Sequence, residues 1–111
     1  MHEHSLADAI VDAAEHRRLS AGASRTTRVT IRVSELSGIT QESLQMMLDH
    51  AAEEAGAQPF PVQITHDGLL GHCPSCGIVP ISDDLVCGLC GAEGVRPAGD
   101  EALLLVSCEF E

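Results

Sequence analysis

Apolar residues recur with two different periods along the chain, and they predict two helices and three strands. Helical spacing covers residues 3–19 and 41–55, and alternation typical of strands covers 28–36, 61–66 and 102–110. The order helix, strand, helix, strand, strand favours an α+β domain. We therefore expect two helices packed on a small three-stranded mixed sheet.

The same pattern predicts which side chains form the core. The inward face of the first helix comprises Leu6, Ala7, Ile10, Val11 and Ala14, and that of the second comprises Leu44, Met47, Leu48, Ala51 and Ala55. The first strand should bury Val29, Ile31 and Val33 and direct Thr30, Arg32 and Ser34 outward. Thr40 is a candidate N-cap of the second helix, and Gly56 should end it.

Residues 68–98 break both periods and carry a paired cysteine motif. The segments Cys73-Pro-Ser-Cys76-Gly77 and Cys87-Gly-Leu-Cys90-Gly91 each place two thiols on one tight turn that a glycine can close. Four thiolates suit tetrahedral Zn²⁺. Two disulfides or a redox motif are the alternatives, but no secretory signal is present and redox Cys-x-x-Cys motifs do not normally come in matched pairs. We expect a structural zinc module of little regular structure, inserted at 68–98 into a domain formed by 1–67 and 99–111.

Composition and charge argue against several classes of function. The 111 residues include seventeen Asp and Glu against six Arg, with no Lys, Tyr or Trp, and the formal net charge is −11. Nucleic-acid binding needs a basic face and is therefore disfavoured. The sequence shows neither an apolar run long enough for a membrane span nor a signal peptide, so we expect a cytoplasmic protein. A complete Cys₄ shell leaves no metal position for water or substrate, and we expect no enzyme activity.

The first residues, Met1-His2-Glu3-His4, contain a candidate chelate. The Met1 amine, the His2 amide nitrogen and the His2 imidazole can close adjacent rings on one metal ion, with a fourth donor from Glu3, His4 or water. Planar nitrogen-rich coordination favours Ni²⁺ or Cu²⁺ over Zn²⁺. A solvated terminal histidine is the plain alternative, and the motif alone does not decide between them.

Taken together, these motifs resemble the HypA/HybF family of nickel metallochaperones for maturation of nickel–iron hydrogenase. The resemblance rests on Met1-His2-Glu3 with Ser5-Leu6, on Glu35-Leu36-Ser37-Gly38 with Glu42-Ser43-Leu44, on the four cysteines, and on Gly99-Asp100-Glu101 with the last strand. His4 is an additional imidazole, Asp100 stands where a basic residue is frequent, and Cys108 lies outside the zinc motif. Because Cys108 falls on an apolar strand face with Leu104, Val106 and Phe110, we expect a buried, inert thiol.

The resemblance implies a carrier that holds Ni(II) and passes it on. Nickel would be bound by His2 with the Met1 amine and Glu3, and Zn(II) at Cys73, Cys76, Cys87 and Cys90 would be structural. The implied partners are a nickel-handling GTPase and the hydrogenase large subunit, with urease maturation as a further destination. The competing hypothesis is a zinc-stapled interaction module that transports no metal. His66 and His72, near the cysteines, are weaker candidates for a second metal contact.

Overall fold

The computed structural model describes residues 2–99 and 102–111, with side chains from Leu6 onward. It divides into two compact units. Unit 1 comprises Met1–Ile31, Thr40–Ile64 and Leu105–Glu111, and unit 2 comprises Arg32–Ile39 and Thr65–Leu104. None of the helices in the described part of the chain is long and apolar enough to cross a membrane.

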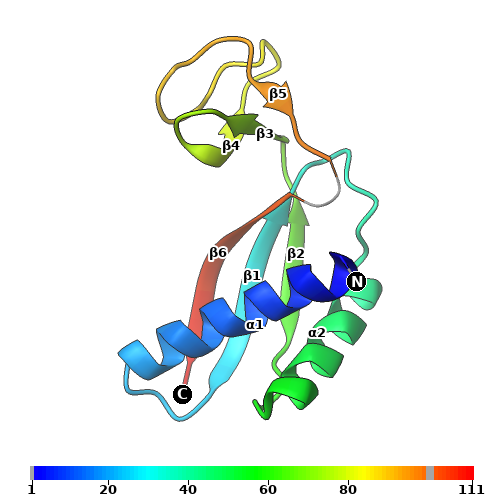
Figure 1. The fold of residues 1–111 in the computed structure, drawn as a ribbon, viewed down its shortest axis with the longest axis vertical. Coiled ribbons are helices and arrows are strands. Elements are labelled where there is room, and N and C mark those ends of the chain that lie inside the picture. Colours follow the sequence, from blue (N-terminus) through cyan, green and yellow to red (C-terminus); the bar gives the residue numbers. More distant parts are fainter. Residues whose placement is uncertain (1, 100–101) are drawn as a thin grey trace. The chain divides into compact units, whose positions relative to one another are not determined.

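Unit 1 is built on a three-stranded sheet with the order β2-β1-β6. Its elements are α1 (His2–Ser20), β1 (Thr26–Val33), α2 (Gln41–Ala55), β2 (Val62–His66) and β6 (Leu103–Phe110), of which the ends of β1, β2 and β6 belong to unit 2. The arrows of β1 and β2 run the same way and that of β6 runs against them, and α1 crosses in front of the strands beside α2 (Figure 1). The predicted mixed sheet with two packed helices is confirmed.

The core of unit 1 follows most of the predicted pattern. Val29 and Ile31 are fully buried, as are the inward residues of α1 from Ala7 to Ala14, and Val33, at the end of β1 that belongs to unit 2, is buried too. Leu6, which was also expected in the core, is only half-buried. Two assignments on α2 were wrong: Ala55 is exposed and Met47 is only half-buried, while Ala52 is buried instead. Ala55 is the last residue of its helix and lines an open groove, so the buried stripe ends one turn earlier.

The predicted ends of α2 are confirmed, whereas the predicted end of the first strand is wrong. The Thr40 hydroxyl accepts a hydrogen bond from the Ser43 N–H at 3.1 Å, and Gly56 ends α2 with φ of 71°, so both predicted caps are confirmed. The first strand was expected to reach residue 36 but ends at Val33. Ser34, expected outward, is buried at 2% exposure, and its hydroxyl accepts a hydrogen bond from the Leu36 N–H at 3.2 Å in the turn after β1.

Strand β6 is less buried than its sequence suggests. Val106 is 55% exposed, and Leu104, Cys108 and Phe110 are half-buried. The expected burial of Cys108 is therefore only partial. The cause is position, since β6 has β1 as its only hydrogen-bonded neighbour in the described sheet.

Unit 2 contains regular structure that the sequence did not predict. Strands β3 (Leu69–Cys73), β4 (Gly77–Ile81) and β5 (Arg96–Pro97) form an antiparallel sheet with the order β4-β3-β5. Its core consists of Cys73, Val79, Ile81, Cys87 and Val95. The expectation of little regular structure over 68–98 was wrong, because closely spaced Gly and Pro masked the alternation of Leu70 and Val79 with their neighbours.

Candidate metal centre

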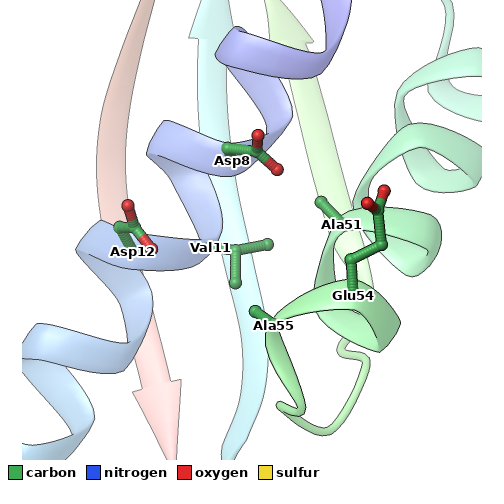
Figure 2. Close-up of a pocket in the computed structure, with 6 residues that line it drawn as sticks. All are labelled: Asp8, Val11, Asp12, Ala51, Glu54 and Ala55. Carbon is green, nitrogen blue, oxygen red and sulfur yellow. The ribbon is translucent and has the colours of Figure 1, made fainter.

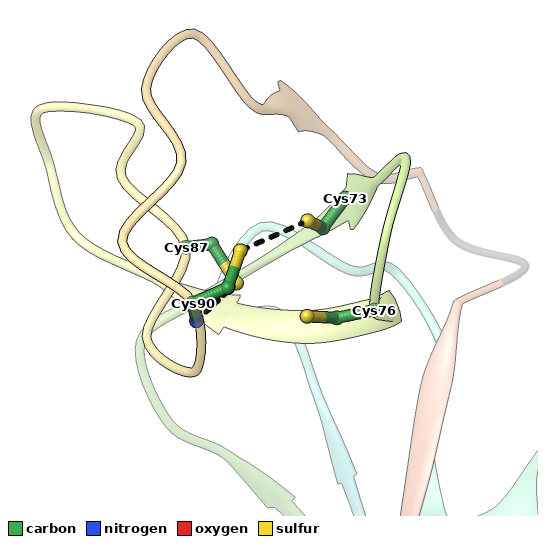
Figure 3. A group of neighbouring side chains, drawn as sticks. All are labelled: Cys73, Cys76, Cys87 and Cys90. Carbon is green, nitrogen blue, oxygen red and sulfur yellow. Dashed lines mark hydrogen bonds between the residues drawn. The ribbon is translucent and has the colours of Figure 1, made fainter.

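The four cysteines of the two motifs converge on one point in unit 2. Cys73 ends β3 and Cys76 directly precedes β4, so the hairpin between these strands supplies one pair. Cys87 and Cys90 come from the following loop, which is held to β4 by the bridge between Ile81 and Cys87. The four Sγ atoms all lie within 4.8 Å of one another (Figure 3). Folding thus joins the two predicted pairs into one cluster.

Each pair contributes one buried and one exposed sulfur ligand. Cys73 and Cys87 are 4% and 3% exposed and belong to the apolar core of unit 2, whereas Cys76 and Cys90 are exposed. The glycines after each pair, Gly77 and Gly91, have φ of 85° and 78°, the left-handed conformation expected of them. The cluster therefore lies at the surface, with half of its ligands anchored in the core.

Backbone groups of the second turn are directed at one sulfur. The N–H groups of Leu89 and Cys90 donate to the Cys87 Sγ at 3.3 and 3.4 Å. These hydrogen bonds, that of Cys90 foremost, lower the pKa of Cys87 to about 6. The turn itself is fixed by the Gly88 N–H, which donates to the Pro80 carbonyl at 2.9 Å. Cys87 is therefore prepared to be a thiolate near neutral pH.

The remaining sulfurs cannot all ionise without a cation. The interaction with Cys90 raises the pKa of Cys76 to about 12, with burial and the other two thiols acting in the same direction. Four thiolates this close together repel one another unless a divalent ion replaces their protons. The four sulfur donors can therefore all be thiolates only when a metal ion is bound between them.

The geometry fits zinc. Zn–S bonds of about 2.3 Å in a tetrahedron place the sulfurs about 3.8 Å apart. The Sγ atoms of Cys73 and Cys90 are 3.6 Å apart, and the other separations stay within 4.8 Å. A Cys₄ shell completes the coordination, so such an ion would be structural and would bind no substrate.

The other candidate ligands do not belong to this cluster. Among the described residues, the group of side chains close enough to share a metal contains only these four cysteines. The His66 ring is hydrogen bonded to the Ile39 carbonyl at 3.0 Å, and Cys108 is on β6. His72 is exposed on β3 beside Cys73 and is not a member of the group.

The predicted nickel ligands are at the start of α1. His2, Glu3 and His4 have helical backbone, while Met1 and the side chains of residues 2–5 lie outside the described part of the chain. The first four N–H groups of a helix have no intrahelical partner, so the amide groups of this segment donate no hydrogen bond within α1. Asp100 and Glu101, cited in the resemblance, also lie outside the described residues.

A second polar feature of unit 1 was not predicted. Three carboxylates, Asp8 and Asp12 of α1 and Glu54 of α2, surround an open groove of about 320 Å³ whose floor is Val11, Ala51 and Ala55 (Figure 2). Sequence periodicity places the acidic side chains on exposed helix faces, but it does not show that the two helices bring them together. The carboxylates do not form a ligand group with metal-like spacing among the described residues.

Sequence reasoning also missed residues that support the cysteines. A Cβ at Gly71 would meet the Val95 side chain at 2.8 Å and the Arg96 carbonyl at 2.9 Å, so β3 and β5 pack closely only because residue 71 is glycine. A Cβ at Gly88 would lie 2.9 Å from the Pro80 carbonyl oxygen. The one available signal was a glycine within an apolar run, which often marks close backbone approach.

Comparison with known proteins agrees with these features. The family model described as "Hydrogenase/urease nickel incorporation, metallochaperone, hypA" matches residues 1–110. The hydrogenase maturation factor HypA of Roseiflexus sp. is 30% identical across the whole chain and 93% of its own length, and that of Azoarcus sp. is 34% identical over 89% of each. The solution structure of the Ni metallochaperone HypA from Helicobacter pylori shares the fold, with a TM-score of 0.65 and 21% identity over 99% of this chain and 97% of that one. The resemblance seen in the motifs is thereby confirmed, and the chain belongs to the HypA family of nickel-incorporation metallochaperones.

Proposed function

We propose that this protein binds Ni(II) at its N-terminus and delivers it during maturation of nickel–iron hydrogenase or urease, while Zn(II) at the four cysteines holds unit 2 together. The observation that carries the proposal is the coincidence of Met1-His2-Glu3 with a family match that begins at residue 1. The family's description names nickel incorporation, and the cysteine cluster, with its complete ligand set, is unsuited to release a metal.

The nickel ligands are the Met1 amine, the His2 amide nitrogen and the His2 imidazole, with a fourth donor from Glu3. The start of α1 at His2 supports this set, since amide nitrogens in the first helical turn can lose a proton without breaking a helical hydrogen bond. Both the amide and the imidazole must be deprotonated, so nickel affinity falls as the pH falls. Planar nitrogen donors favour Ni²⁺ over Zn²⁺, which keeps the two metals at separate sites.

Delivery proceeds by ligand exchange and involves no catalytic turnover. The partners are a nickel-handling GTPase and the hydrogenase large subunit. The formal net charge of −11 suits a partner with a basic surface, which would speed the encounter. Residues 1–67 with 99–111 form the nickel-binding part and 68–98 the zinc module in this proposal.

Calorimetric titration of Ni²⁺ into untagged, zinc-loaded protein tests the proposal. Wild type and His4→Ala should bind one nickel tightly, and His2→Ala should lose that binding while keeping its zinc, which native mass spectrometry counts. Equal nickel binding by wild type and His2→Ala would place nickel elsewhere. No nickel binding by the wild type would favour a zinc-stapled interaction module.

A further inference from the structure

The four sulfurs of the cysteine cluster differ in their access to solvent. Cys76 and Cys90 are exposed. Cys73 and Cys87 are buried and belong to the apolar core of unit 2. The reactivity of a cysteine toward an oxidant follows its thiolate character and its exposure, and zinc coordination keeps all four sulfurs as thiolates. A dissolved oxidant can therefore reach two of the four ligands directly.

Hydrogen bonds make Cys87 the least reactive of the four. Its Sγ accepts from the N–H groups of Leu89 and Cys90 at 3.3 and 3.4 Å. Donors of this kind stabilise the thiolate, and a thiolate becomes a weaker nucleophile as its basicity falls. Cys87 is thus protected both by burial and by its hydrogen bonds. Oxidation should begin elsewhere in the cluster.

The exposed sulfur of Cys90 has a buried sulfur in contact with it. The Sγ atoms of Cys73 and Cys90 are 3.6 Å apart and share a hydrogen bond (Figure 3). Cys73 ends β3 and Cys90 lies in the loop after β4, so this contact joins the two Cys-x-x-Cys motifs. A disulfide bond of about 2.05 Å needs the two sulfurs to approach by only about 1.5 Å.

We propose that Cys90 is a site of reversible oxidation by hydroperoxides and that its product is a disulfide bond between Cys73 and Cys90. The Cys90 thiolate attacks one peroxide oxygen, so that an S–O bond forms, the O–O bond breaks and hydroxide leaves. The Cys73 thiolate then attacks the Cys90 sulfur, so that the S–S bond forms, the S–O bond breaks and a second hydroxide leaves. The two thiolates lose two electrons in total, and hydrogen peroxide is reduced to two hydroxide ions.

Oxidation should release zinc and still leave unit 2 crosslinked. The disulfide removes two ligands, and the remaining thiolates of Cys76 and Cys87 do not complete a tetrahedral shell. The new bond nevertheless ties the end of β3 to the loop after β4, in place of the metal. Thiol exchange would reverse the oxidation and restore the ligands. Release presupposes the zinc site of the proposed function and is independent of the nickel site.

Treatment of the zinc-loaded full chain with stoichiometric hydrogen peroxide tests the proposal. A chromogenic zinc indicator should detect one zinc released per chain, and peptide mapping without reduction should find Cys73 joined to Cys90. A thiol reductant followed by zinc should restore the starting protein. Zinc that stays bound after the peroxide is consumed would overturn the proposal, as would a main product that joins Cys73 to Cys76 or Cys87 to Cys90. A reduced chain that carries no zinc at the outset would instead refute the zinc site itself.

A control variant and a second measurement sharpen the test. Cys108→Ser removes the fifth cysteine, which is not a member of the cluster. It should release zinc at the wild-type rate and form the same disulfide, and a loss of either effect would assign the reaction to Cys108. Hydrogen exchange compares two zinc-free forms of the wild type, one oxidised and one reduced and chelated. Amide protection in β3 and β4 should be higher in the oxidised form, and equal protection would contradict the crosslink.

Discussion

The side chain of Gln45 takes the place of a neighbouring strand beside Val62. Its amide oxygen accepts a hydrogen bond from the buried Val62 N–H at 2.8 Å. The same amide binds the Phe60 carbonyl, so one α2 residue satisfies two main-chain groups of β2. This hydrogen bonding links α2 to the sheet through polar contacts in addition to the apolar face centred on Leu44 and Leu48.

Gln45→Ala should therefore destabilise unit 1. Leaving a buried N–H without a partner costs about 1–3 kcal/mol. Urea unfolding followed by circular dichroism measures the loss. Gln63→Ala is the control, since residue 63 is exposed on the same strand and its truncation should change the free energy of unfolding by less than about 0.5 kcal/mol. Equal effects of the two substitutions would show that the amide contributes nothing.

Zinc removal should unfold unit 2 selectively. Its apolar core contains two of the ligands, Cys73 and Cys87, so loss of the ion removes the link between the β3–β4 hairpin and the following loop. Treatment with a chelator should abolish amide protection in β3 and β4 and leave that of α1 and β1, as measured by hydrogen exchange.

The matched variants for this prediction are Cys73→Ser and Cys108→Ser. The first should lose zinc, and the second should retain one zinc per chain because Cys108 is not a member of the cluster. Zinc retention by Cys73→Ser would mean that three cysteines and water suffice, and the structural assignment of the site would be weakened.

A methyl group at residue 88 should disturb the second cysteine turn. Gly88→Ala brings a Cβ to 2.9 Å from the Pro80 carbonyl, the same oxygen that accepts the Gly88 N–H. We expect a loss of about 1–3 kcal/mol together with weaker zinc binding. The neighbouring Leu89→Ala removes a side chain that is 73% exposed and should leave both nearly unchanged. Thermal unfolding and competition with a chelator distinguish the two variants.

The ion pair between Arg25 and Glu111 should be visible in the titration of Glu111. The hydrogen bond and charge of Arg25 lower the pKa of Glu111 below 4.5. Because the folded-state pKa is depressed, the pair stabilises the fold above the unfolded pKa and loses this contribution as the pH falls through the folded value. NMR titration should show the Glu111 pKa rising toward 4.5 in Arg25→Gln and in high salt. An unchanged pKa in both would refute the pairing.

The sequence pattern predicted the helices and strands of unit 1 and the four cysteines of the metal site. It failed where the structure depends on contacts between residues far apart in the sequence. Thr40 and Gly56 were predictable because capping is local. The hairpin of unit 2 was not, because β3 and β4 are short and their stability comes from the core around Val79 and from the cysteine cluster. The exposure of Ala55 and of Val106 could not be inferred from the sequence. Each depends on which other helix or strand packs against the end of α2 or the edge of β6. The two Cys-x-x-Cys pairs predicted a single metal site, and the structure brings all four sulfurs together at one point.

The most direct test of nickel delivery is whether nickel requires a free N-terminal amine. Native mass spectrometry should count one nickel and one zinc on the unmodified protein, and one zinc with no nickel after selective acetylation of the Met1 amine. The chain contains no lysine, so this reaction has a single amine target. Nickel retained in full by the acetylated protein would contradict the proposed site and, with it, the account of this protein as a carrier that binds nickel through its N-terminus.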